Sequence, residues 1–217
     1  MGYLEKKRDA FLNTIQTGRL PNSYQEVLYI KAIDNAYIGT GFYCDGNVDF
    51  DCKFSQFSAN SNSLFRTTID IGSNWFTYGM RFSTGNEMQP LIGFRAALNN
   101  FSIAYKDGSE HTIAKVDKKI FVDKQSKKTL SYADFEKIPY SLYLFARNNN
   151  GSPDQFCSGA IHYFILSENN EIKRNFIPCY YKKTGEIGMW DTVTKKFYTN
   201  QGTGYFEKGP NVVEWLL

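Results

Sequence analysis

The sequence lacks several features that would assign it to a common functional class. No apolar run approaches the roughly 18 residues that a membrane-spanning helix needs. The charged N-terminus, Met1–Arg8, is not followed by the apolar segment of a secretory signal peptide. The longest basic run is Lys6-Lys7-Arg8 and the net charge is only +3, so no nucleic-acid-binding stripe is indicated. We therefore expect a soluble chain, made in the cytoplasm, that neither inserts into a membrane nor binds nucleic acid.

Motifs for metal binding and catalysis are missing as well. No Cys-x-x-Cys pair occurs, and the two histidines, His111 and His162, lie far apart, so no zinc site is predicted. The chain has no Gly-x-Ser-x-Gly elbow, no P-loop and no string of alternating carboxylates of the kind that glucanases carry on one strand. We therefore predict no enzyme, no catalytic residue and no cofactor, and we interpret His162 as structural. The cysteines are expected to be buried thiols, with a Cys44–Cys52 bridge as the alternative in an oxidising compartment.

The densest carboxylate cluster is Asp49-Phe50-Asp51. It alternates with an apolar face that includes Val48 and Phe54, which is typical of a half-buried antiparallel strand. We therefore expect both carboxylates to face solvent. Calcium binding by Asp45 and Asp49 stays open as an alternative, although calcium loops usually carry a denser set of oxygen ligands.

The sequence does contain the material of a β-rich core. Hydrophobic residues make up 42% of the 217 residues and aromatic residues 17%, and aromatic side chains favour strands. From residue 20 onward the apolar pattern has a period of two, interrupted by turn signals such as Asp107-Gly108 and Asn150-Gly151. About a dozen short strands at this spacing predict one antiparallel sandwich over residues 20–217. The expected strands include 27–33, 37–42, 48–54, 63–71, 75–82, 91–97, 101–106, 111–116, 119–123, 140–147 and 160–167, followed by hairpins over 180–190 and around Thr194-Lys195-Lys196.

The segment before residue 20 has a different pattern. Leu4, Phe11, Leu12 and Ile15 recur near helical spacing, and Gly18 and then Pro21 would end a helix. A helix over residues 3–17 is too short to be stable alone, so it should dock on another surface. We expect residues 1–19 to form an anchor that precedes the sandwich.

Motifs near both ends of the chain carry a resemblance to a known family. Two examples are Ala36-Tyr37-Ile38-Gly39-Thr40-Gly41-Phe42 and Gly185-Glu186-Ile187-Gly188-Met189-Trp190-Asp191. The others lie at residues 20–30, 142–148, 160–164, 174–179 and 196–206. In this order they resemble LamG-type, concanavalin A-like domains of phage structural proteins and of surface proteins of gut bacteria. The resemblance covers about residues 20–209, and residues 55–135 match only in strand rhythm.

The resemblance implies a concanavalin A-like jelly-roll β-sandwich with a role in a virion or at a cell surface. The shared motifs look like framework, and Gly185, Gly188, Gly202 and Gly204 suit turns and close packing. We expect a non-enzymatic phage virion protein, a head or tail decoration or a fibre component, that binds carbohydrate or the host surface. Residues 3–17 would contact other virion proteins, and a homo-oligomer is expected. The alternatives are a purely structural decoration protein and a secreted bacterial surface lectin.

One predicted strand carries the residues that best suit a sugar. In residues 75–82, Phe76, Tyr78, Met80 and Phe82 share one face, which we assign to the core. Trp75 and Arg81 flank small residues on the other face and would form a shallow platform. An ordinary outer sheet face or a subunit contact is the alternative. Arg147 and Asn148, beside an asparagine-rich loop, complete the candidate ligand-binding residues.

Overall fold

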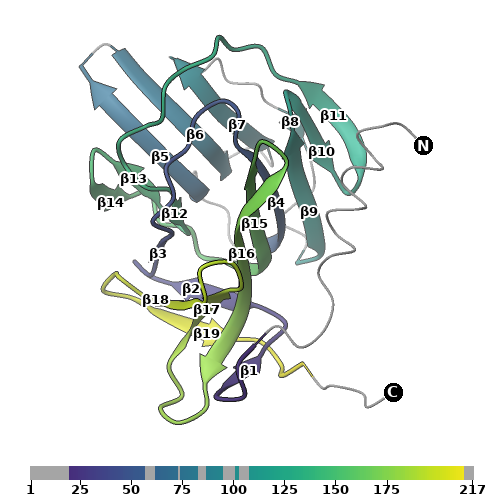
Figure 1. Ribbon diagram of the computed structural model, residues 1–217, viewed down its shortest axis with the longest axis vertical. Helices are drawn as coiled ribbons and strands as arrows, with labels where there is room; N and C mark the ends of the chain where they lie inside the picture. Colours follow the sequence, from purple (N-terminus) through teal and green to yellow (C-terminus); the bar gives the residue numbers. More distant parts are fainter. Residues whose placement is uncertain are drawn as a thin grey trace.

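The computed structural model describes residues 20–56, 62–72, 74–82, 87–94, 101–102 and 108–212. Within these ranges the chain forms strands, turns and irregular segments, and no helix occurs (Figure 1). The predicted fold class, an all-β jelly-roll sandwich, is confirmed, with two sheets formed by the described strands. The helix predicted over residues 3–17 lies outside the described residues. No helix long and apolar enough to cross a membrane is found in the part of the chain that the structure describes.

The larger sheet has eleven strands among the described residues. They are β1 (Tyr24–Glu26), β2 (Ile30–Ile33), β4 (Asp49–Gln56), β9 (Glu110–Val116), β10 (Lys119–Val122), β11 (Gln125–Thr129), β15 (Gly159–Glu168), β16 (Glu171–Tyr181), β17 (Ile187–Asp191), β18 (Lys196–Thr199) and β19 (Tyr205–Lys208). The main path runs β11-β10-β9-β4-β15-β16-β17-β18, while β1 pairs with β16 and β2 pairs with both β15 and β19. The first and last parts of the domain are thereby joined in one sheet.

The smaller sheet has eight strands among the described residues. They are β3 (Ile38–Gly39), β5 (Ser63–Ile71), β6 (Asn74–Phe82), β7 (Glu87–Phe94), β8 (Phe101–Ser102), β12 (Tyr143–Leu144), β13 (Arg147–Asn149) and β14 (Ser152–Asp154). The main path runs β14-β13-β5-β6-β7-β8, and β12 joins β3 to β5. In Figure 1 the edge formed by β13 and β14 lies on the left, beside β5.

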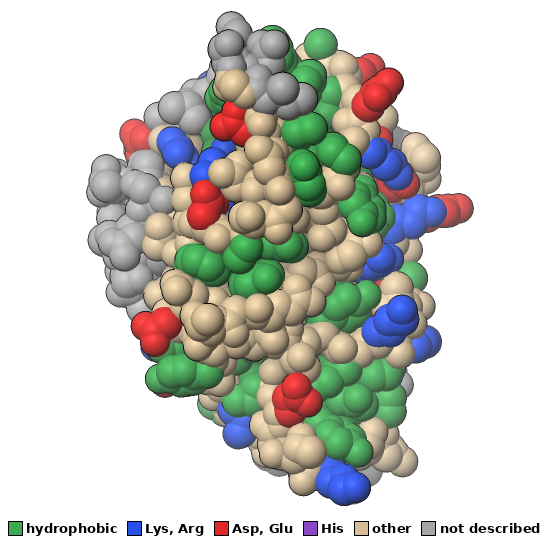
Figure 2. Space-filling view, turned by 90° about the vertical axis from the view of Figure 1, so that its left-hand side faces the viewer, with side chains coloured by type: hydrophobic (Ala, Val, Ile, Leu, Met, Phe, Trp, Pro, Cys, Tyr) green, Lys and Arg blue, Asp and Glu red, His purple; other side chains and the backbone are tan. Residues whose placement is uncertain are grey.

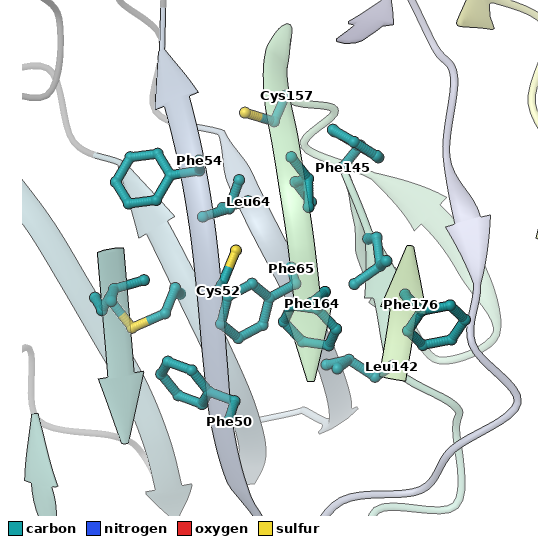
Figure 3. Packing of buried hydrophobic residues seen from close by; sticks show 14 of the residues in the cluster. Phe50, Cys52, Phe54, Leu64, Phe65, Leu142, Phe145, Cys157, Phe164 and Phe176 are labelled. Carbon is teal, nitrogen blue, oxygen red and sulfur yellow. The ribbon is translucent and has the colours of Figure 1, made fainter. Parts of the chain in front are cut away.

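Aromatic side chains from both sheets meet in the core between them (Figure 3). Phe65 of β5 lies 4.8 Å from Phe50 of β4 and 4.7 Å from Phe164 of β15, measured between ring centroids. Each such pair adds about 0.5–1.5 kcal/mol beyond the burial of its surface. The apolar halves of these alternating strands therefore hold the two sheets together.

Several predicted elements agree closely with the structure. Residues 63–71 form β5, and the strands predicted at 75–82, 111–116 and 119–123 agree with β6, β9 and β10 within one residue at either end. The four framework glycines also match. Gly185 has a positive φ in the turn after β16, and a Cβ at Gly188, Gly202 or Gly204 would overlap backbone carbonyl oxygens.

The strand predicted over residues 140–147 is wrong in detail. Phe145 has a φ of 65°, which breaks the extended backbone and separates β12 from β13. β13 then pairs with β5 in parallel, whereas we expected antiparallel pairing throughout. Because parallel strands require a crossover of the chain, a local pattern does not reveal this pairing.

The predicted solvent exposure is wrong for Asp51 and holds only in part for Asp49, whose side chain is 20% exposed. Asp51 is only 3% exposed and accepts a 2.8 Å hydrogen bond from the hydroxyl of Tyr163 on β15. Asp49 accepts a hydrogen bond from the Nζ of Lys115 on β9, at 2.9 Å. Tyr163 thus covers Asp51 from β15, whereas Lys115 is opposite Phe50 on the core face and reaches Asp49 at the start of β4.

Lys115 provides a test of this buried charge pair. Its side chain is 0% exposed, its ammonium group also donates to the carbonyl of Val48 at 2.7 Å, and burial lowers the pKa of Lys115. Lys115→Met should cost roughly 1–3 kcal/mol of unfolding free energy, because Asp49 then loses its cation. Urea unfolding measures the effect in Lys115→Met and in the double variant that also carries Asp49→Asn. Lys119→Met, which removes an exposed amine nearby, is the control. A double variant as unstable as Lys115→Met alone would contradict the explanation.

Candidate ligand-binding site

The two faces of β6 are assigned by the packing of its side chains. Tyr78, Met80 and Phe82 are fully buried in the core, as predicted. Thr77 and Arg81 therefore lie on the opposite face, which we call the outer face of the smaller sheet. This face is not an open platform, since Thr77 is 0% exposed and Arg81 is half-buried. The residues around Arg81 explain why.

Three arginines occupy this outer face, one on each of three strands. Arg66 of β5 is opposite Gly79 of β6 on one side and opposite Arg147 of β13 on the other. Arg81 lies two residues beyond Gly79 on β6 and therefore on the same face. We call Arg66, Arg81 and Arg147 the arginine cluster.

Arg66 is the most deeply placed member of the cluster. It is 4% exposed, and its guanidinium donates hydrogen bonds to the hydroxyl of Thr77 at 2.9 Å and to the side-chain carbonyl of Gln155 at 3.2 Å. Both acceptors are neutral. The ion pairs within the described residues give Arg66 no carboxylate, although a buried charge normally has one.

The other two arginines have different partners. Arg147 makes a two-pronged ion pair with Asp154 on the edge strand β14, with an Nε–Oδ1 distance of 2.6 Å. Arg81 donates to the side-chain carbonyl of Gln89 on β7 at 2.5 Å. Two positive charges of the cluster thus face neutral oxygens. Figure 2 shows the side of the molecule on which β13 and β14 lie in Figure 1. Basic and acidic side chains lie next to one another in the upper left part of this view.

Burial and the neighbouring positive charges both lower the pKa values of Arg66 and Arg81. Burial lowers the pKa of Arg66 to about 9, Arg147 and Arg81 lower it further, and the charge of Asp154 raises it. Burial also lowers the pKa of Arg81, and Arg147 adds to the effect. The guanidinium groups are therefore close enough to repel one another, and the positive charge of this face is only partly neutralised.

An unpaired acceptor lies next to the cluster. Asn149 of β13 is opposite Thr68 of β5 and shares the outer face with Arg147. Its side-chain carbonyl oxygen is buried and has no hydrogen-bond partner among the described residues. Such an atom costs free energy unless a donor reaches it. The site thus combines a surplus of positive charge with one unused acceptor.

The four predicted binding residues, Trp75, Arg81, Arg147 and Asn148, do not all lie together in the structure. Arg81 and Arg147 come together through Arg66. Trp75, half-buried, is opposite Asp70 near the start of β6, on the same face but six residues from Arg81. Asn148 is not part of this face, since it lies between Arg147 and Asn149 on β13 and so points the opposite way. It is 2% exposed, and its amide bonds the carbonyl of Ser141 and the N–H of Gly151.

Arg66 was missed because a single arginine in an apolar strand carries little information. A signal was present, however. The antiparallel pairing of residues 63–71 with 74–82 places Arg66 opposite Gly79 and thus near Arg81. Its closeness to Arg147 depends on the parallel pairing of β13 and has no counterpart in the sequence pattern.

On the larger sheet, contacts connect Ser55, His162 and Glu110, which we call the Ser–His–Glu line. No such triad was predicted from the sequence. Ser55 Oγ is 3.2 Å from His162 Nε2, and His162 Nδ1 is 3.3 Å from Glu110 Oε1. Ser55 is only 3% exposed, and its strand is paired on both sides, opposite Glu110 and Ala160. Because ladder pairing uses the local N–H groups that an oxyanion would need, we interpret the line as a structural polar network.

Within the described ranges, the cysteine thiols and the carboxylates do not form a metal-binding group. All four cysteines are buried and none is in a disulfide. No group of three or more His, Cys, Asp or Glu residues there is arranged to hold a metal ion. Asp45, considered for calcium, accepts the N–H of Asn47 at 2.8 Å, and Asp49 accepts from Lys115.

Comparison with known proteins shows a likeness in structure and none in sequence. No protein-family model matches the sequence, and no curated protein matches it. Among solved structures, the chain is similar to domains LG4-5 of the mouse laminin alpha1 chain, with 11% sequence identity and a TM-score of 0.46. The match covers 77% of this chain and 49% of that chain, so the chain spans about half the length of that structure. This likeness does not test the predicted phage or gut-bacterial context, which stays a prediction.

Proposed function

We propose that this protein is a non-enzymatic binding domain and that the outer face of its smaller sheet binds a carbohydrate. The observation that carries the proposal is the arginine cluster, in which buried Arg66 has only neutral partners. Planar polar side chains such as Arg66, Arg81, Gln89 and Gln155 suit the edges of a sugar ring, and Trp75 lies on the same face. Binding sites usually combine a few such convergent polar groups with aromatic surface.

The resemblance of residues 20–209 supports a place for this domain in a phage virion, as a head or tail component made in the host cytoplasm. Within this proposal residues 3–17 contact other virion proteins, and the carbohydrate belongs to the host surface. No catalytic step is included, because Ser55 of the Ser55–His162–Glu110 line is buried in a paired part of the sheet.

The proposal is tested with labelled protein on intact bacteria and on their extracted capsular polysaccharides, with free polysaccharide as competitor. We expect saturable binding that is competed, and a loss of roughly tenfold or more in the Trp75→Ala/Arg81→Ala variant, since truncation of central aromatic and arginine contacts often costs more than 1 kcal/mol each. Tyr205→Ala, at a side chain 54% exposed on the larger sheet, should bind normally.

The opposite outcomes separate the alternatives. Absence of binding to any tested host, with the chain present in purified particles, would favour a purely structural decoration protein. Binding by a chain found on bacterial surfaces and absent from particles would favour a secreted lectin. Binding that the Trp75→Ala/Arg81→Ala variant retains in full would place the binding site elsewhere on the molecule.

A further inference from the structure

One row of side chains on the larger sheet is buried although it points away from the core. The row crosses five strands, from β10 through β9, β4 and β15 to β16, at directly opposed positions. Its members and their exposed fractions are Phe121 6%, Ala114 4%, Asp51 3%, Ile165 0% and Asn175 7%. We call these five residues the outer row. The alternate positions of the same strands, such as Phe164 and Phe176, fill the core instead.

The two described sheets do not provide the cover of the outer row. They pack together on the other side of these strands, through the core. The segment between β11 and β12, residues 130–142, lies toward the smaller sheet, where Phe135 is 5.9 Å from Phe76 between ring centroids. An apolar sheet face is favourable in water only when a further segment or molecule packs on it.

The described chain begins beside this face. Tyr24 lies in β1, which pairs with β16, and its ring is 4.9 Å from that of Trp190. Trp190 is opposite Ile177 of β16, which is two residues from Asn175 and therefore on the face of the outer row. The nineteen residues that precede residue 20 are thus attached next to this face.

The segment 3–17 has the length and the pattern to cover the outer row. In a helix over this segment one face carries four apolar residues, Leu4, Phe11, Leu12 and Ile15. Arg8 lies on the same face, one turn after Leu4 and one turn before Leu12. Such a helix is about 22 Å long, and the five strands of the row extend over about 19 Å.

We propose that residues 3–17 of the same chain pack as a helix on the outer row, with Arg8 paired with Asp51. Arg8 is the one charge within the apolar stripe of the segment, and Asp51 is the one charge within the outer row. Asp51 accepts a hydrogen bond from Tyr163, and a buried carboxylate is most favourable when a cation also reaches it. The opposite side of the helix, with Lys6, is then the side available to other virion proteins.

Hydrogen–deuterium exchange of the full chain, read by mass spectrometry, tests the docking. The amides of residues 6–15 should exchange roughly a hundredfold or more slowly than those of an unstructured peptide, because a docked helix must first open. Arg8→Met should reduce this protection by roughly tenfold, since Asp51 then loses its cation. Lys6→Met is the matched control, because it removes a charge from the opposite side and should leave the protection unchanged.

Asp51→Asn shows whether the two charges meet. The variant keeps the shape of the side chain and should reduce the protection of residues 6–15 about as much as Arg8→Met does. The double variant should be little worse than either single one, because one interaction can be lost only once. Losses that multiply in the double variant would disprove the pairing. Protection of β6, in the smaller sheet, should stay constant throughout, which rules out general unfolding as the cause.

Other occupants of the outer row give different results. Residues 6–15 that exchange as fast as an unstructured peptide in the full chain would overturn the docking and leave the row to a partner protein. Protection that appears only as the protein concentration rises would contradict docking within one chain and identify a second copy as the occupant. Polysaccharide binding is measured separately on the smaller sheet, so failure of that proposal and failure of the docking are distinguishable.

Discussion

Replacement of Asp191 by alanine is expected to lower the unfolding free energy by roughly 3–5 kcal/mol, because a buried carboxylate with several donors is removed. Asp191 ends β17 and is 0% exposed. Its Oδ1 accepts the backbone N–H groups of Asn175 at 2.9 Å and Val193 at 3.1 Å, and its Oδ2 accepts the hydroxyl of Thr194 at 2.7 Å. The alanine variant leaves the buried N–H of Asn175 and the part-buried donors of Val193 and Thr194 without this acceptor.

Equilibrium unfolding in urea measures this effect. Asp191→Asn should fall between the two proteins, because the amide keeps one acceptor but directs a donor at groups that also donate. Asp134→Ala is the matched control, since that carboxylate is 81% exposed and its loss should cost less than about 0.5 kcal/mol. A loss below about 1 kcal/mol for Asp191→Ala would show that the turn between β17 and β18 does not depend on this carboxylate.

Gly79→Ala should be comparably destabilising, by roughly 3–5 kcal/mol, through steric overlap in the smaller sheet. Gly79 has a φ of 152°, and a Cβ there would overlap the carbonyl oxygen of Phe65 and lie 2.7 Å from the Cα of Arg66. Both are backbone atoms of β5, so relief requires the strands to separate. The same shift would move Arg66 out of its contacts with Thr77 and Gln155.

Gly72→Ala separates this overlap from the effect of backbone conformation. Gly72 lies in the turn of the same hairpin and has a φ of 65°, but an added Cβ would meet no atom within 4 Å. Only the left-handed conformation is then unfavourable, at about 1–2 kcal/mol. Thermal unfolding of both variants should show the larger loss for Gly79→Ala, and equal losses would contradict the overlap argument.

The sequence allowed the core side of each strand to be predicted more securely than the site. Alternation in residues 75–82 correctly assigned Tyr78, Met80 and Phe82 to the interior. The same alternation placed Trp75 and Arg81 on the outer face but gave no sign that Thr77 between them is fully buried and that both are half-buried. Burial depends on neighbouring segments, as it does for Asp51, which Tyr163 covers from β15.

The sequence by itself determined the all-β class, most strand positions and the glycines at the turns, because a period of two and turn chemistry are local properties. Only the tertiary structure decided which charged residues meet. Arg66 and Arg147 are 81 positions apart, and they become neighbours because β13 pairs in parallel with β5 after the chain breaks at Phe145. Local patterns set which way a side chain points, whereas strand order and register set what it faces, and these depend on the packing of the whole domain.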